Sequence, residues 1–178
     1  MTALRWLVVI TAVGAGLIVL TIIIGVVLPR TFTAVRTASY GRPVAEVWKV
    51  ITDFPATPTW RPGVIKVIRG VDAGGKPVWE ETFRNNMALH LATEEFVPEK
   101  RLVRRIFGEG LPFTGRWIFA LAPEGGGTRI VLTEEGDVPN PFFRFVSKVI
   151  MGHDRHLDKY LVDLGNKFGE KVSPSSPK

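Results

Sequence analysis

Cysteine is absent from this sequence of 178 residues. Without it the chain has no disulfide framework, no thiolate nucleophile and no cysteine-based metal site. Histidine is scarce as well, because only His90, His153 and His156 occur. His153 and His156 stand three apart, a spacing that can place two ligands near one metal ion. Two histidines make an incomplete site and no HExxH pattern is present, so neither a metal nor another cofactor is expected.

Charge is absent from residues 7–28, which are rich in valine, isoleucine and leucine. As a helix that rises about 1.5 Å per residue, this stretch reaches about 33 Å, enough to cross the hydrocarbon core of a bilayer. A cleaved signal peptide has a shorter apolar region that ends in small residues, whereas Leu28, Pro29 and Arg30 stand here. The stretch therefore predicts an uncleaved, single-pass membrane anchor over residues 1–30.

Positive charges flank this span unequally. Arg5 precedes it, whereas Arg30, Arg36 and Arg42 follow it. Because positively charged flanks tend to remain on the cytoplasmic side, this bias favours a cytoplasmic position for the rest of the chain.

The net charge of +6 and the isoelectric point near 9.9 favour anionic partners. For a tethered domain the nearest anionic surface is the lipid headgroup layer. Nucleic acid is not expected, because the basic residues are scattered among aspartate and glutamate. Arg101, Arg104 and Arg105 form a dense cluster, but no helix-turn-helix or zinc-finger pattern accompanies it.

Residues 31–172 are predicted to form one α+β domain, followed by a disordered tail over residues 173–178, which are rich in serine and proline. A short helix is expected at residues 43–52, and the prolines of residues 53–62 prevent a long regular element there. The strands are joined by short loops that accept turn geometry, which is typical of an antiparallel meander. The expected strands are residues 33–40, 64–71, 77–83, 87–97, 102–107, 113–121 and 128–135.

Residues 141–168 carry apolar side chains at spacings of three and four, the period of one apolar helix face. Asn140 can cap this helix, and Pro141 suits its first position because the missing N–H costs nothing there. One helix of this length measures about 42 Å and would cross the whole domain. Gly152 and Gly165 are its weak points, since each costs about 1 kcal/mol relative to alanine.

Alternation along the strands assigns their faces. The set Gly115, Trp117, Phe119 and Leu121 is more apolar than its alternate, so it is expected to look inward. In residues 87–92 neither alternating set is clearly polar. Such a strand is either covered on both faces or faces a cavity on one of them.

Charged side chains on the strands are expected, by default, to point outward and to pair across strands. Any that face inward become acid–base or ligand-orienting groups. This set comprises Glu80, Arg84, Glu94, Glu95, Arg104, Arg105 and Arg116. His90 and Glu94 share the same strand parity and are the candidate catalytic residues, with His90 as the general base.

Several residue patterns accompany this order of elements: Pro43, Val44, Val47 and Trp48 leading to Asp53; Trp60 and Pro62; Gly115, Trp117 and Leu121; the turn at residues 126–129; and Leu157, Tyr160, Leu161 and Leu164. With them, the chain resembles the helix-grip fold of the START-like superfamily, also called SRPBCC, and in particular its polyketide cyclase/dehydrase branch. The resemblance implies an antiparallel sheet of about seven strands wrapped around a long C-terminal helix. It supplies no catalytic motif that can be transferred residue by residue.

The resemblance also implies a cavity between sheet and helix that binds hydrophobic or amphipathic molecules. The expected lining comprises Trp60, Leu89, Leu91, Trp117, Phe119, Val149, His153 and Leu157. The wall is expected to open near Gly152 and His153. We therefore predict a membrane-anchored domain that binds a hydrophobic or amphipathic small molecule or lipid. The alternative is a cyclase- or dehydrase-like enzyme that uses the same cavity. A third possibility is an interaction module whose cavity is filled by its own side chains. The sequence does not determine the oligomeric state.

Overall fold

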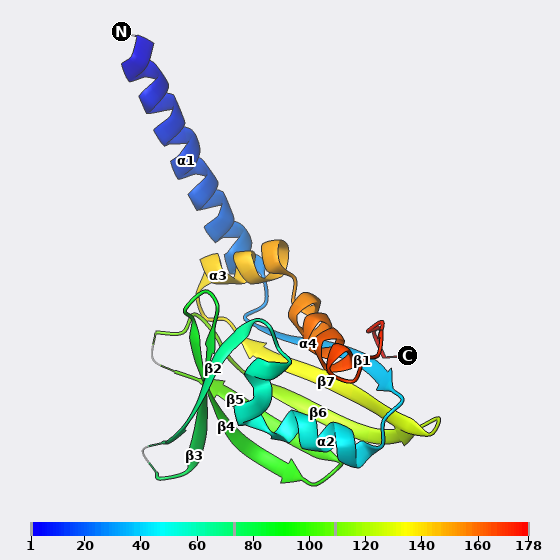
Figure 1. Ribbon diagram of the computed structural model, residues 1–178. Coiled ribbons are helices and arrows are strands. Elements are labelled where there is room, and N and C mark those ends of the chain that lie inside the picture. The colour runs from blue at the N-terminus through cyan, green and yellow to red at the C-terminus, as the bar shows by residue number, and fades with distance from the viewer. Residues whose placement is uncertain (1, 73, 109, 178) are drawn as a thin grey trace.

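The computed structural model of the protein describes residues 2–72, 74–108 and 110–177. A long apolar helix, α1 (Thr2–Val27), projects from an α+β domain (Figure 1). By length and composition, residues 3–27 can cross a membrane. A signal sequence near an N-terminus meets the same criteria of length and composition. α1 therefore agrees with the expected anchor but does not distinguish an anchor from a signal sequence.

Seven antiparallel strands form one sheet in the order β1-β7-β6-β5-β4-β3-β2, which confirms the expected meander. Strands β2 to β7 pair consecutively, and β1 returns to pair with β7. The boundaries expected from alternation lie within a few residues of those observed. The strands are β1 (Thr31–Tyr40), β2 (Val64–Val71), β3 (Pro77–Phe83), β4 (Ala88–Val97), β5 (Arg101–Phe107), β6 (Thr114–Glu124) and β7 (Gly127–Asp137).

Two short helices, α2 (Val44–Thr52) and η1 (Phe54–Thr59), connect β1 to β2 and lie over one face of the sheet (Figure 1). α2 buries Val47, Trp48 and Ile51, which share one helix face. η1 is a 3-10 helix, because its prolines lack the N–H donors that a longer α-helix requires.

The helix expected over residues 141–168 is broken, and that prediction was wrong. α3 (Pro141–Phe145) runs into a π-helical turn, η2 (Val146–Met151), and α4 (Asp154–Lys167) begins only after Gly152. Gly152 has φ of 70° and ψ of 130°, a conformation that lies outside the helical region and is accessible mainly to glycine. The C-terminal helix on the sheet is therefore α4 alone, with 14 residues.

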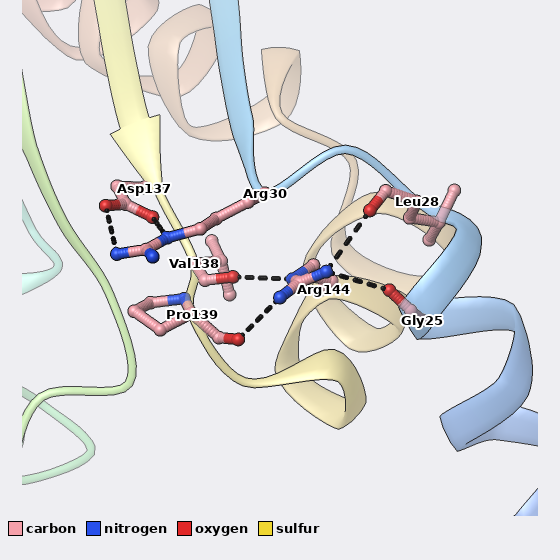
Figure 2. Close-up of polar contacts among 7 residues, drawn as sticks. All are labelled: Gly25, Leu28, Arg30, Asp137, Val138, Pro139 and Arg144. Carbon is pink, nitrogen blue, oxygen red and sulfur yellow. Dashed lines mark hydrogen bonds and ion pairs between the residues drawn. The ribbon is translucent and has the colours of Figure 1, made fainter.

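Arg144 of α3 holds the end of α1 (Figure 2). Its Nε donates to the carbonyl oxygen of Val138 at 2.8 Å, and its Nη2 donates to that of Pro139 at 2.6 Å. Its Nη1 donates to the carbonyl oxygens of Gly25 and Leu28, at 3.4 and 3.3 Å. The first part of the expected helix therefore belongs to the junction between α1 and the domain.

The linker after α1 is tied to the end of β7. Arg30 Nε and Nη2 donate to the two carboxylate oxygens of Asp137, at 2.6 and 2.9 Å (Figure 2). These hydrogen bonds hold the pKa of the Asp137 carboxyl below its usual range. The backbone N–H of Val138 donates to the Arg30 carbonyl oxygen at 2.9 Å, so side chain and backbone join the same two segments.

The core lies between the inner face of the sheet and α4, and the predicted inward face of β6 is confirmed by the burial of Phe119 and Leu121. Tyr40 of β1 donates its hydroxyl to the carbonyl oxygen of Leu161 at 2.9 Å, and burial raises the pKa of that hydroxyl. The most deeply buried large side chains are Phe119, Leu102, Ile130, Leu132, Leu157, Leu161, Leu164 and Val47.

The tail expected to be disordered over residues 173–178 is paired with the sheet in the part that the structure describes. Ser175 and Thr37 of β1 exchange backbone hydrogen bonds of 3.0 and 2.8 Å. Arg36 Nη2 donates to the carbonyl oxygen of Pro174 at 3.0 Å. The free edge of β1 thus provides hydrogen-bond partners for these residues, which their serine- and proline-rich composition does not predict. Lys178 lies outside the described residues.

Replacing Gly152 with alanine tests the break between η2 and α4. A side chain at this φ and ψ is strained by about 1–3 kcal/mol, so Gly152→Ala should lower the melting temperature of the full-length chain in detergent. Gly63→Ala is the control, because its new Cβ meets nothing within 4 Å. Equal melting temperatures for wild type and Gly152→Ala would contradict the break.

Candidate functional site

His90 and Glu94 lie on β4 and face the side of the sheet opposite α4. Their neighbours Leu89 and Leu91 take the inner positions of the strand and are buried. His90 Nε2 lies 3.1 Å from Glu80 Oε2, and both side chains are partly exposed. Equal strand parity thus turns both candidate residues outward, away from the predicted cavity.

Glu94 pairs with two arginines rather than with His90. Its carboxylate oxygens lie 2.9 Å from Arg105 Nε and 2.7 Å from Arg116 Nε. An irregularity in the pairing of β4 with β5 leaves Glu94 without a register partner. Among the described residues no hydrogen bond joins Glu94 to His90, so the two do not form an acid–base dyad.

A shallow hollow of about 520 Å³ lies on this outer face. It is not the cavity expected between sheet and helix, and its two arginines are already paired with Glu94. Its lining includes Thr31, Thr33, Arg105, Phe107, Arg116, Glu135 and Asp137.

Inside the domain, Glu81 of β3 lies between two arginines. Its Oε2 accepts from Arg61 Nη1 at 3.2 Å, and its Oε1 accepts from Arg104 Nη1 at 2.7 Å. Arg61 follows η1, whereas Arg104 is an inward residue of β5 that lies between Leu102 and Ile106 along alternate positions. The side chains of Glu81 and Arg104 are buried, and that of Arg61 is 11% exposed. Because one carboxylate faces two guanidinium groups, the cluster keeps one net positive charge.

Two nitrogen atoms of this cluster, Nε and Nη2 of Arg104, are buried and have no hydrogen-bond partner among the described residues, and the same holds for Nε1 of Trp60. Arg104 is only 6% exposed. Its guanidinium carbon lies 4.0 Å from the centre of the Phe54 ring, which provides cation–π attraction. A buried donor without an acceptor costs about 1–3 kcal/mol. The interior therefore presents donors for which the described residues supply no acceptor.

Aromatic rings enclose the arginines. The Arg61 guanidinium carbon lies 4.7 Å from the centre of the Tyr160 ring and 5.5 Å from that of Trp117. Trp60 meets Tyr160 edge to face, at 5.3 Å between ring centres. Burial raises the pKa of the Tyr160 hydroxyl, which therefore remains protonated and able to donate. Flat apolar surface and polar donors thus lie together, a combination suited to an amphipathic ligand.

Glu134 of β7 is a second buried carboxylate, near the start of α4. Trp117 Nε1 donates to its Oε1 at 3.1 Å, and His156 Nε2 lies 2.5 Å from its Oε2. The partly exposed His156 ring is stacked on Trp117, at 5.9 Å between ring centres. Glu134 therefore links the interior aromatic residues to the first turn of α4, next to the break at Gly152.

Most of the predicted lining residues are buried, in two adjoining groups. Trp60, Trp117, Phe119 and Leu157 belong to or contact the main core cluster. Leu89 and Leu91 form a smaller cluster with Ile106, and Trp117 contacts both clusters. Trp60 also lines a hollow of about 320 Å³ between α2, η1 and the end of α4.

His153 and Val149 lie outside this interior. His153 stacks on Phe32 of β1, at 3.5 Å between ring centres, and lines a hollow of about 190 Å³ together with Leu28 and Lys148. Val149, another predicted lining residue, is 59% exposed. The break after η2 carries this side chain away from the sheet.

Arg61, Glu81 and Glu134 were missed as site residues, and Arg104 was assigned outward by default. Strand parity contained a usable signal, because Arg104 alternates with the apolar Leu102 and Ile106. Arg61 belongs to an irregular segment, for which no periodicity predicts an orientation.

Most of the chain matches a known family. A match to the family described as "Polyketide cyclase / dehydrase and lipid transport" covers residues 31–155. The chain belongs to this family. The part matched to the polyketide cyclase / dehydrase and lipid transport family contains all seven strands and the start of α4, whereas α1 lies outside it. No curated protein matches the chain.

Solved structures share the fold of this family member at low sequence identity. A START superfamily protein from Mycobacterium smegmatis aligns with a TM-score of 0.57 at 14% identity, over 76% of this chain and 95% of its own. A protein from Mesorhizobium loti aligns with a TM-score of 0.59 at 16% identity, over 79% and 97%. CalU16 from Micromonospora echinospora aligns with a TM-score of 0.53 at 21% identity, over 79% and 76%. At these identities the likeness concerns the fold.

The neighbours Glu80 and Glu81 give a matched test of the interior cluster. Glu81→Gln leaves the buried arginines without their counter-charge, so it should lower the free energy of unfolding by about 3–5 kcal/mol. Glu80→Gln, on the exposed outer face, should cost less than about 1 kcal/mol. Thermal unfolding of both full-length variants in detergent measures the difference. Similar losses for the two would contradict the inward placement of Glu81.

His153 generates a prediction about acid stability. Burial lowers its pKa below the ordinary value of 6.5. As the pH falls through that value, the unfolded chain binds a proton before the folded chain does, and the free energy of unfolding decreases. His153→Phe keeps a ring against Phe32 but cannot titrate, so its melting temperature should fall less than that of wild type between about pH 8 and about pH 5. Equal decreases would refute this role of His153.

Proposed function

We propose that the protein binds an amphipathic small molecule or lipid between the inner face of the sheet and α4, while α1 tethers this domain, residues 31–172, to a membrane. Membership of a family described by cyclase, dehydrase and lipid-transport activities supports a ligand-binding role. The single observation that carries the proposal is Arg104, a buried guanidinium group with two nitrogen atoms that lack an acceptor in the part of the chain that the structure describes.

The polar end of the ligand lies at Arg104 and the apolar body lies against the aromatic rings. An oxygen atom placed at Nε and Nη2 of Arg104 relieves the cost of the unmet donors. The net positive charge of Arg61, Arg104 and Glu81 favours an anionic or acceptor-rich group. Trp60 Nε1 is a further buried donor without an acceptor among the described residues.

The ligand reaches this site where α4 begins. A cluster of buried side chains lies between sheet and helix, so binding requires some of them to move. Gly152 interrupts the helix at this end, and the stacked pair of Phe32 and His153 separates the interior from the 190 Å³ hollow beside α1. Separation of that pair opens a route from the membrane side to Glu134 and Trp117.

A membrane tether gives the site access to its ligand. Molecules that partition into a bilayer are concentrated next to a domain held at its surface. α1 supplies the span, and the positive charge at Arg30, Arg36 and Arg42 favours the cytoplasmic side for the domain. The enzymatic alternative based on His90 and Glu94 gains no support, because both residues face away from the core.

Arg104 and Arg105 provide the test of ligand binding. The full-length chain, delipidated in mild detergent and exposed to oleate, should show a one-to-one adduct in native mass spectrometry and a raised melting temperature. Arg104→Lys keeps a charge beside Glu81 but removes the guanidinium fork, so the adduct should weaken about tenfold or more. Arg105→Lys, on the outer face, should bind as wild type does.

Two results count against this assignment. If neither oleate nor a total lipid extract binds to or stabilises the wild-type chain, the ligand-binding function is wrong. If Arg104→Lys and Arg105→Lys bind oleate equally, a ligand is present but its polar end does not lie at Arg104.

A further inference from the structure

Residues 141–151, which form α3 and η2, expose large apolar side chains. The exposed fractions are 42% for Phe142, 40% for Phe143, 59% for Val149 and 60% for Ile150. A single helix through Gly152 would have laid this apolar face on the sheet. Because the chain turns there, the described part of the protein leaves these side chains uncovered.

The segment lies at the level where α1 ends. Gly25 approaches the backbone of Pro141 so closely that an added Cβ would lie 1.9 Å from the Pro141 carbonyl oxygen. Arg144 donates to the carbonyl oxygens of Gly25 and Leu28 (Figure 2). Figure 1 shows α3 lying across the end of α1, between that helix and the sheet. If α1 spans a bilayer, residues 141–151 therefore lie at its surface.

The charges of the segment suit lipid headgroups. Arg144 and Lys148 are its charged residues, and no acidic residue occurs between Asp137 and Asp154. Exposed aromatic and aliphatic side chains next to basic ones are typical of helices that lie in a membrane interface, with the apolar face about 5–10 Å deep. Well-placed basic residues attract an anionic leaflet.

We propose that residues 141–151 are an interfacial membrane-binding segment that inserts Phe142, Phe143, Val149 and Ile150 into the same leaflet from which α1 emerges. This inference rests on the proposed anchor. The segment and α1 together hold the domain in one orientation on the membrane. The hollow lined by Lys148 and His153 then faces the lipid, at the end of the domain where access to the interior is proposed.

A lipid leaflet fits this surface better than a second copy of the chain. A stable protein interface buries about 800 Å² on each partner, more than these few half-exposed side chains offer. A leaflet imposes no such minimum area, and it is already adjacent to the segment through α1.

The absence of cysteine makes the test direct. Single cysteines at Phe143, Ile150, Val13 and Lys100 receive an environment-sensitive fluorophore, and each full-length variant is reconstituted into phosphatidylcholine–phosphatidylglycerol vesicles with or without lipids that carry a doxyl quencher. Labels at Phe143 and Ile150 should emit at shorter wavelength and lose most of their emission to the quencher. The label at Lys100, in the exposed turn between β4 and β5, should not.

The label at Val13, within α1, separates the two proposals. If it is quenched while labels at Phe143 and Ile150 behave like that at Lys100, the interfacial segment is refuted and the anchor stands. If the Val13 label is not quenched either, α1 does not span the vesicle bilayer and both ideas fail. Shielding of Phe143 and Ile150 from aqueous iodide without lipid quenching, and only at high protein density, would identify a second copy as the occupant and overturn the proposal.

A charged substitution within the segment supplies a second test. Ile150→Glu should reduce lipid quenching of the label at Phe143, because a carboxylate is expelled from the acyl region and repelled by anionic headgroups. Ile65→Glu is the matched control, since Ile65 is also half exposed but lies on β2. Unchanged quenching in Ile150→Glu, with the Val13 label still quenched, would contradict membrane contact by this face.

Discussion

The buried carboxylate of Glu81, held between the guanidinium groups of Arg61 and Arg104, is the constraint on which the interior depends. Removing ions from water costs several kcal/mol each, and a well-packed apolar cluster of similar volume is often at least as stable. One carboxylate here meets two cations, and Arg104 retains unmet donors. Stability alone does not account for this excess of donors. An acceptor group of the proposed ligand would meet these donors, so the excess supports the proposed binding site.

The second constraint is the junction held by Arg144. Its four carbonyl partners belong to α1, to the residues that follow it and to the segment after β7, so one side chain links α1 to the domain. Gly152 then turns the chain back towards the sheet, and His156 on α4 contacts Glu134 of the interior. Residues 141–151, the break at Gly152 and His156 therefore follow one another along a short stretch of chain, and His156 connects that stretch to the buried Glu134.

Local periodicity was sufficient for the sheet. Alternation in β6 correctly turned Trp117 and Phe119 inward, because side chains on a strand alternate regardless of what covers them. Residues 141–168 do form helical segments with the expected apolar spacing, but a helical period shows only that one face is apolar. It does not reveal whether the sheet, α1 or lipid covers that face. The single-helix prediction failed at Gly152 for this reason, and the exposure of Val149 follows from the same break.

The apolar span, the strand meander, the apolar helical faces and the inward aromatic residues could all be derived from the order of amino acids, since each depends on neighbours within a few positions. The polar part of the site could not. Arg61, Glu81 and Arg104 come from an irregular turn and two non-adjacent strands, and they meet only when the sheet closes around them. Whether a charged side chain is paired, buried or left with free donors depends on that three-dimensional arrangement, because desolvation and hydrogen bonding are properties of the surroundings and not of the residue.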